Sequence, residues 1–230
     1  MKEQGSMNDT NDLNEMRAFI AETGKRLFDR HLMDMAGGNI SARVGEFVCI
    51  SPRYSGTRHH WNLRPEDVMV IDMNGTILEG AGELSRESKV HLRLHHEFGD
   101  MGTAIVHSHA RNVLVFAALA RSLPPVLEAT RKFGEVPVID YAPAHSAQLS
   151  EYVAAGIRPN AERIRKQAAG VIAPYHGVFV MGKDLDAAAD AVERFDTNAY
   201  CIMMGQMLGA SAMLADERTQ METAITTFDK

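Results

Sequence analysis

The spacing of hydrophobic residues changes along the chain, and each change predicts a different secondary-structure element. Over residues 12–33 the hydrophobic positions recur roughly every three to four residues, which predicts an amphipathic helix. Short apolar runs bounded by glycine-containing turns follow, and such runs predict strands. The runs lie at residues 40–43, 47–50, 68–72, 76–78, 103–106, 136–139, 170–173 and 177–180. Helical spacing returns over residues 85–98, 109–119, 161–168 and 185–207, with Ser85 as the expected N-cap of the first of these helices.

Helices and hairpins alternate without an internal repeat or a linker, so the pattern predicts one domain. The expected fold class is α/β, with a central, largely antiparallel sheet that is covered by helices. The predicted domain covers residues 12–215, and we expect a flexible tail at residues 1–11 and a second tail at residues 216–230.

The charge of the chain excludes some classes of partner. It carries 30 acidic and 24 basic residues, a net charge of −6, without a cluster of lysine or arginine. This balance argues against a nucleic-acid partner and against a membrane-surface role. The apolar stretches are too short to span a bilayer, and two cysteines far apart do not suggest a disulfide framework. We therefore expect a cytoplasmic protein.

Two histidines at the end of an apolar run are the most informative feature of the sequence. His107 and His109 follow the run at residues 103–106, and alternate residues of a strand face the same side. His176 lies between two further apolar runs. Three histidines with an open fourth position are typical of a catalytic zinc site. From spacing alone, separate core or surface histidines are an equally good interpretation.

Glu87 lies just before the histidine strand, in the first turns of a predicted helix. A carboxylate near a divalent ion can serve as a general acid or base, although taken by itself Glu87 is better explained as a favourable charge at a helix N-terminus. The remaining histidines, among them His91, His95 and His145, have no evident partner in the sequence.

Three segments are candidates for binding an anion. Gly37, Gly38 and Asn39 form a turn that can expose backbone N–H groups, as phosphate-binding turns do. Further hydroxyl, backbone and guanidinium donors lie at Ser55, Gly56, Ser85 and Arg86. Ordinary turns and helix caps are the alternative interpretation.

Taken in order, five motifs resemble the class II aldolase/adducin family. They lie at residues 37–43 (GGNISAR), 50–56 (ISPRYSG), 84–91 (LSRESKVH), 107–110 (HSHA) and 176–177 (HG), and the resemblance covers residues 12 to 210. It implies a central antiparallel sheet between helical layers and a homotetramer with active sites at subunit interfaces. It also implies that His107, His109 and His176 hold Zn2+, and three imidazoles suit Mn2+, Co2+ or Fe2+ as well.

The resemblance implies an aldolase. The zinc enzyme would cleave a small ketose phosphate, a sugar 1-phosphate, to dihydroxyacetone phosphate and an aldehyde through a metal-stabilised enediolate. Glu87 would be the acid/base. The substrate phosphate would be bound by the turns at Gly38, Asn39, Ser55 and Gly56 and by Ser85.

Some positions depart from the aldolase pattern and keep other reactions open. Arg86 stands where the aldolases commonly have a second serine, so it could bind a phosphate or a carboxylate. Glu87 favours an aldolase over the epimerases, which tend to have aspartate there. Glu128 is a second acid/base candidate, since dehydratases of the family use a glutamate in a similar stretch. A dehydratase, decarboxylase or 4-epimerase acting on a related phosphorylated sugar or sugar acid is the alternative. A non-catalytic, adducin-type structural module is disfavoured because it need not keep three histidines and a glutamate.

Overall fold

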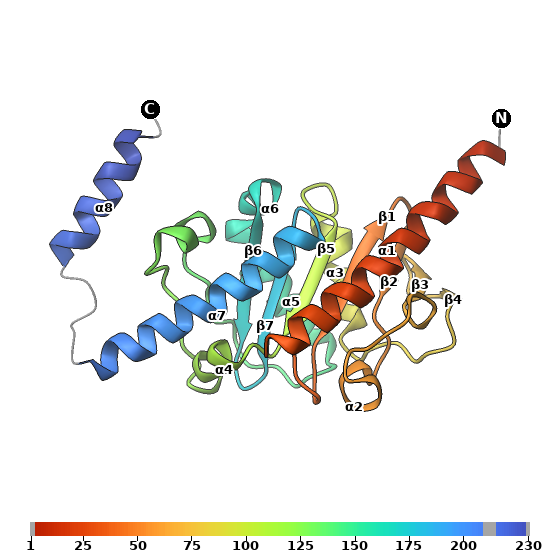
Figure 1. The fold of residues 1–230 in the computed structure, drawn as a ribbon, viewed down its shortest axis with the longest axis horizontal. Coiled ribbons are helices and arrows are strands. Elements are labelled where there is room, and N and C mark those ends of the chain that lie inside the picture. The colour runs from red at the N-terminus through yellow and green to blue at the C-terminus, as the bar shows by residue number, and fades with distance from the viewer. Residues whose placement is uncertain (1–2, 209–214, 229–230) are drawn as a thin grey trace.

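Seven strands form one sheet in the order β4-β3-β2-β1-β5-β7-β6, and every neighbouring pair is antiparallel (Figure 1). The structure is a computed structural model that describes residues 3–208 and 215–228. The strands are β1 (Asn39–Val44), β2 (Phe47–Ile50), β3 (Met69–Asp72), β4 (Ile77–Glu79), β5 (Ala104–Ser108), β6 (Ala168–Ala173) and β7 (Gly177–Gly182).

Helices cover both faces of this sheet, and Figure 1 shows the two long helices that cross the face nearer the viewer. The first face carries α1 (Glu3–Asp29), α4 (Arg111–Ala118) and α7 (Leu185–Met207). The second carries α3 (Ser88–Phe98), α5 (Ala147–Ile157) and α6 (Glu162–Lys166). The other helices are α2 (Ser55–His59), α8 (Ala215–Phe228), η1 (Pro65–Asp67), η2 (Glu128–Phe133) and η3 (Arg158–Asn160). In the described part of the chain, every helix is too short or too polar to cross a membrane.

The hydrophobic core is divided by the sheet. Val106 of β5 packs with α1, α4 and α7, whereas its neighbour Ile105 packs with α3, α5 and α6. Val180 and Phe179 of β7 divide in the same way, because successive strand residues point to opposite faces. The predicted α/β class, an antiparallel sheet between helical layers, is confirmed.

Several predicted elements differ from the structure. Residues 136–139 form only isolated bridges, Leu123 with Val136 and Val138 with Ile172, so the strand predicted there was wrong. The helix α5 was missed, although its N-cap Ser146 accepts a hydrogen bond from the Leu149 N–H at 3.1 Å.

The N-cap predicted at Ser85 was also wrong. Helix α3 begins at Ser88 with Glu87 at the N-cap position, because the Ser85 hydroxyl donates to the Glu87 carboxylate instead.

The domain limits and tails stay predictions. Helix α1 begins at Glu3 rather than near residue 12, and α8 covers much of the segment predicted as the second tail. Residues 1–2 and 229–230 of the predicted tails lie outside the described residues.

Trp61 fixes the connection between α1 and β1. Its side chain is fully buried, and its Nε1–H donates to the Asp34 carbonyl at 3.3 Å. The ring lies against Gly24 of α1 so closely that a Cβ added there would be 2.5 Å from Trp61 Cε3. The absence of a side chain at Gly24 therefore allows the indole to pack under the turn that precedes β1.

We predict that Gly24→Ala lowers the free energy of unfolding by about 1–3 kcal/mol, because the added methyl must displace a buried indole. Gly205→Ala is the matched control: it also lies in a helix, but no described atom comes within 4 Å of its added Cβ. That substitution should raise the stability by up to about 1 kcal/mol. Urea denaturation measures both changes, and equal effects would contradict the packing argument.

Candidate metal centre and acid–base site

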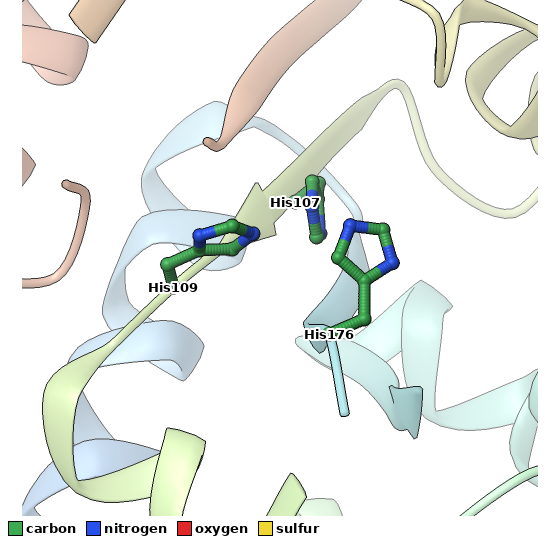
Figure 2. Close-up of side chains that lie close together, drawn as sticks. All are labelled: His107, His109 and His176. Atoms are coloured by element: carbon green, nitrogen blue, oxygen red, sulfur yellow. The ribbon is translucent and has the colours of Figure 1, made fainter. Parts of the chain in front are cut away.

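Three histidine side chains converge where β5 ends and β7 begins (Figure 2). His107 is on β5, His109 follows the strand, and His176 directly precedes β7. Their ring centroids are 5.0 Å apart for His107 and His109, 4.7 Å for His107 and His176, and 5.6 Å for His109 and His176. One nitrogen from each ring lies within 4.8 Å of the others. The structure thus brings together all three histidines that the sequence singled out.

The nitrogens at the centre of this triad fit a metal ion. His107 Nε2, His109 Nε2 and His176 Nδ1 are buried and have no hydrogen-bond partner among the described residues. Leaving a buried polar atom unpaired costs about 1–3 kcal/mol, so three such nitrogens close together are the arrangement expected of ligands that share one ion. Three imidazole donors suit Zn2+ and related divalent ions.

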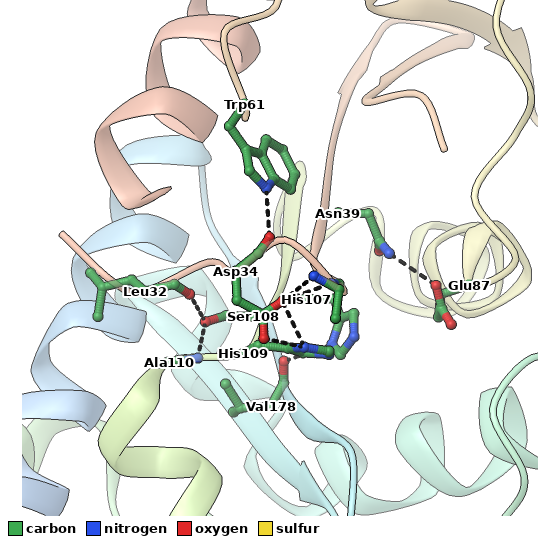
Figure 3. A network of polar contacts seen from close by, with 12 residues as sticks. Leu32, Asp34, Asn39, Trp61, Glu87, His107, Ser108, His109, Ala110 and Val178 are labelled. Carbon is green, nitrogen blue, oxygen red and sulfur yellow. Dashed lines mark hydrogen bonds and ion pairs between the residues drawn. The ribbon is translucent and has the colours of Figure 1, made fainter. Parts of the chain in front are cut away.

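Hydrogen bonds on the opposite ring nitrogens set the tautomers. His107 Nδ1 donates to the Val178 carbonyl at 3.1 Å, and His109 Nδ1 lies 3.2 Å from a carboxylate oxygen of Asp34 (Figure 3). With the proton on Nδ1, the lone pair of Nε2 is free to bind a metal. Burial, together with the neighbouring His176 and His109, holds the pKa of His107 well below its usual value, so its ring is neutral.

Phe179 restricts the ring of His107 further. The two rings stack with their centroids 4.1 Å apart and their planes 13° from parallel. Both side chains are buried, so the imidazole is held on one face by the phenyl ring and at Nδ1 by the backbone.

Asp34 connects this ligand set to the glycine turn, and the sequence reasoning missed it. Besides contacting His109, its carboxylate accepts hydrogen bonds from the Gly37 N–H at 2.7 Å and the Ala36 N–H at 2.9 Å. Burial opposes ionisation, but His109 and these N–H groups outweigh it and lower the pKa of Asp34. A Cβ at Gly37 would lie 2.1 Å from His109 Cε1, so the turn packs directly on the histidine.

Glu87 is held by donors on both carboxylate oxygens. Oε2 accepts hydrogen bonds from Ser85 Oγ at 2.9 Å and from Asn39 Nδ2 at 3.1 Å. Oε1 lies 2.9 Å from His145 Nδ1. His145, which has no evident partner in the sequence, is therefore a second missed member of the site.

Two buried histidines lie on the side of Asn39 away from Glu87. His91 Nε2 bonds to Asn39 Oδ1, and Ser41 Oγ bonds to His91 Nδ1 at 2.6 Å and to His95 Nε2 at 2.9 Å. Burial, assisted by the charge of His95, lowers the pKa of His91 to about 3. Burial also lowers the pKa of His95 to about 3, with a smaller contribution from Arg43.

A cavity of about 320 Å³ gathers most of the predicted site residues. Its wall includes Gly38, Asn39, Ser55, Gly56, Ser85, Arg86, Glu87, His107, His109 and His176, and also His145. Glu128 is exposed at the start of η2 and does not belong to this wall. The roles assigned to all of these residues stay predictions, while their grouping is a feature of the structure.

The sequence held one usable signal for the missed residues. Asp34 precedes Gly37 by three positions, a spacing at which an aspartate often bonds to the backbone of a turn. The sequence around His145 gives no such signal. Its partner Glu87 is 58 positions earlier, and only the packing of α5 against α3 brings the two residues together.

Comparison with known proteins finds relatives that match most of the chain. The profile described as Class II Aldolase and Adducin N-terminal domain matches residues 18–203. An L-fuculose phosphate aldolase of Methanococcus maripaludis (strain C7) is 31% identical over 165 residues, covering 70% of this chain and 82% of that protein. A 5-deoxy-D-ribulose 1-phosphate aldolase of Bacillus thuringiensis is 26% identical over 220 residues, covering 94% of this chain and 97% of that protein.

A solved structure shares the fold. An L-fuculose 1-phosphate aldolase superposes with a TM-score of 0.76 at 24% identity, covering 95% of this chain and 97% of the other. The likeness supports the observed arrangement of sheet and helical layers.

We predict that Asp34→Asn weakens metal binding about 10–100-fold, because the carboxylate no longer orients His109. Competition with a chromophoric chelator for Zn2+ measures the affinity. Asp29→Asn is the control, since Asp29 is an exposed carboxylate that pairs with Lys25 on α1. Equal zinc affinities for the two variants would contradict this role of Asp34.

We also predict that the metal-free protein loses stability as the pH falls from about 6.5 towards 3. The pKa of His95 is about 3 in the folded protein, so the unfolded chain takes up the proton first and protonation favours unfolding. Each such histidine contributes up to about 1.4 kcal/mol per pH unit in this range. His95→Gln can keep a hydrogen bond to Ser41 without titrating, so its free energy of unfolding should fall less steeply with acid. Identical slopes in urea denaturation at several pH values would refute this.

Proposed function

The chain belongs to the class II aldolase and adducin family, and from this premise we propose that it is a zinc-dependent aldolase that cleaves a small ketose 1-phosphate to dihydroxyacetone phosphate and an aldehyde. The relatives named as aldolases place it among the lyases. The observation that carries the proposal is the convergence of three unpartnered imidazole nitrogens and a fixed carboxylate in one polar cavity.

His107, His109 and His176 would hold the metal. A divalent ion bound there supplies a Lewis acid for the carbonyl and hydroxyl oxygens of the sugar and stabilises negative charge that develops on them. Neutral imidazoles leave the net positive charge of such an ion undiminished, which suits this chemistry.

The phosphate of the substrate would be bound by the turns that line the same cavity. Gly38 has a φ of +99°, a conformation that other residues rarely adopt. Ser55 and Gly56 line the same cavity, where the Ser55 hydroxyl donates to the Pro52 carbonyl at 2.6 Å, and Ser85 is adjacent to the proposed acid/base. These contacts would fix the register of the sugar rather than perform chemistry.

Glu87 would move the protons. Cleavage requires a proton to leave the hydroxyl of the carbon that becomes the aldehyde, and a proton to reach the carbon of the other product. The carboxylate is 12% exposed and held at both oxygens, so it is positioned for transfer at a defined point of the cavity.

The position of Arg86 in the cavity wall favours a second candidate function. A guanidinium in the cavity wall suits a carboxylate as well as a phosphate, so a decarboxylase, dehydratase or 4-epimerase acting on a phosphorylated sugar acid is the alternative. Glu128 lies outside the cavity of its own chain, and it would reach a site only across an interface of the proposed homotetramer. We further propose that the enzyme is cytoplasmic, as its charge balance and two distant cysteines led us to expect.

We predict that the zinc-loaded protein releases dihydroxyacetone phosphate from at least one member of a panel of ketose 1-phosphates. A coupled glycerol-phosphate dehydrogenase assay follows the release, which should fall to background after chelation. Glu87→Gln should lower kcat about 10²–10⁴-fold while zinc is retained.

The control is His96→Ala, whose ring contacts the Met73 carbonyl outside the cavity and should leave kcat unchanged. Zinc-loaded protein that is inactive on the whole panel would overturn the aldolase proposal and direct the assay to phosphorylated sugar acids.

A further inference from the structure

We propose that His145 and Arg86 are positioning residues that hold the Glu87 carboxylate in one orientation. His145 contacts Glu87 directly, and Arg86 acts through His145 by fixing its tautomer. The proposal rests on Glu87 being the acid/base of the proposed function.

The hydrogen-bond directions follow from the three groups. Arg86 Nη1 lies 3.1 Å from His145 Nε2, and a guanidinium can only donate. Nε2 therefore accepts, so the proton of the neutral ring is on Nδ1. Nδ1 is 2.9 Å from Glu87 Oε1 and donates to it. Arg86 thus selects the tautomer that can hold Glu87.

The bridge completes the set of donors around Glu87. Ser85 and Asn39 donate to Oε2, and without His145 no described residue donates to Oε1. A carboxylate held at only one oxygen can rotate away, and misplacement of about 1 Å can reduce catalysis about 10²-fold. His145 therefore decides whether the second oxygen keeps its position.

The backbone at His145 is consistent with this role. Its φ is +73°, in the left-handed region that is uncommon for residues other than glycine. Such a conformation costs about 1–3 kcal/mol and persists where the surroundings impose it. The next residue, Ser146, caps α5, and α5 packs against α3, whose N-cap position is Glu87. The strained residue lies at the contact between the starts of the two helices.

The contacts of Arg86 favour the positioning of His145 over the binding of substrate. Of the two arginines in the cavity wall, Arg53 forms an ion pair with Glu83 at 2.9 Å. Within the described part of the chain, the Arg86 side chain donates its hydrogen bond to His145. If Arg86 instead bound the substrate, its removal would affect KM and would act independently of His145.

The first experiment does not depend on activity. Imidazole ¹⁵N chemical shifts of the zinc-loaded full-length protein at about pH 8 report which nitrogen of His145 is protonated. We expect an Nδ1–H tautomer in the wild type and a shift towards Nε2–H in Arg86→Ala. Arg53→Ala is the matched control and should leave the signal unchanged. The same tautomer in wild type and Arg86→Ala, or protonation of both nitrogens in the wild type, would overturn the proposal.

The second experiment compares variants in the dihydroxyacetone phosphate assay. His145→Ala should lower kcat about 10–100-fold with KM changed less than about 3-fold. The double variant with Arg86→Ala should lose no more than His145→Ala alone, since both remove one interaction. His145→Asn supplies an amide donor near the former Nδ1 and should recover much of the loss.

Additive losses with a raised KM for Arg86→Ala would assign Arg86 to substrate binding and refute its positioning role. An inactive wild type would refute the proposed aldolase function, while the tautomer measurement would still decide whether the bridge exists.

Discussion

Antiparallel pairing of β5 with β1 and β7 is the constraint on which the rest of the site depends. Asn39 at the start of β1 pairs with His107 near the end of β5, and β7 begins directly after His176. Since neighbouring antiparallel strands start where their partners end, these segments meet at one end of the central strands. Glu87 lies at the same end of these strands because the Asn39 side chain donates a hydrogen bond to its carboxylate. The proposed metal ligands and the proposed acid/base are therefore brought together by the register of hydrogen bonds between the strands.

At this end of the sheet, several of the proposed functional side chains are oriented by groups for which we propose no chemical role. The carbonyl of Val178 and the carboxylate of Asp34 orient two of the histidines. His91 orients Asn39, which orients Glu87. Orientation of this kind removes the rotational freedom that a side chain would otherwise lose during reaction. The buried, neutral histidines add no charge that would compete with a bound cation or the substrate.

The glycine turn at residues 37–39 and the three histidines are in direct contact. Asp34 bonds to the backbone of Gly37 and to His109, and Gly37 itself packs against the imidazole. A change in the turn that is proposed to bind phosphate would therefore move a proposed metal ligand. In the proposed function, such coupling would let the binding energy of the substrate phosphate align the reacting end of the substrate.

The sequence by itself determined the fold class, the division into strands and helices for most of the chain, and the three histidines. These features follow from local periodicity and from an i, i+2 pair on a strand, which are properties of short segments. Tertiary structure alone decided that Asp34 contacts His109 and that His145 contacts Glu87, because those partners are far apart in the chain. It also replaced the expected strand at residues 136–139 with isolated bridges, and it left Glu128 outside the cavity. Local patterns fix which face of an element is buried, whereas contacts between loops depend on how whole helices pack.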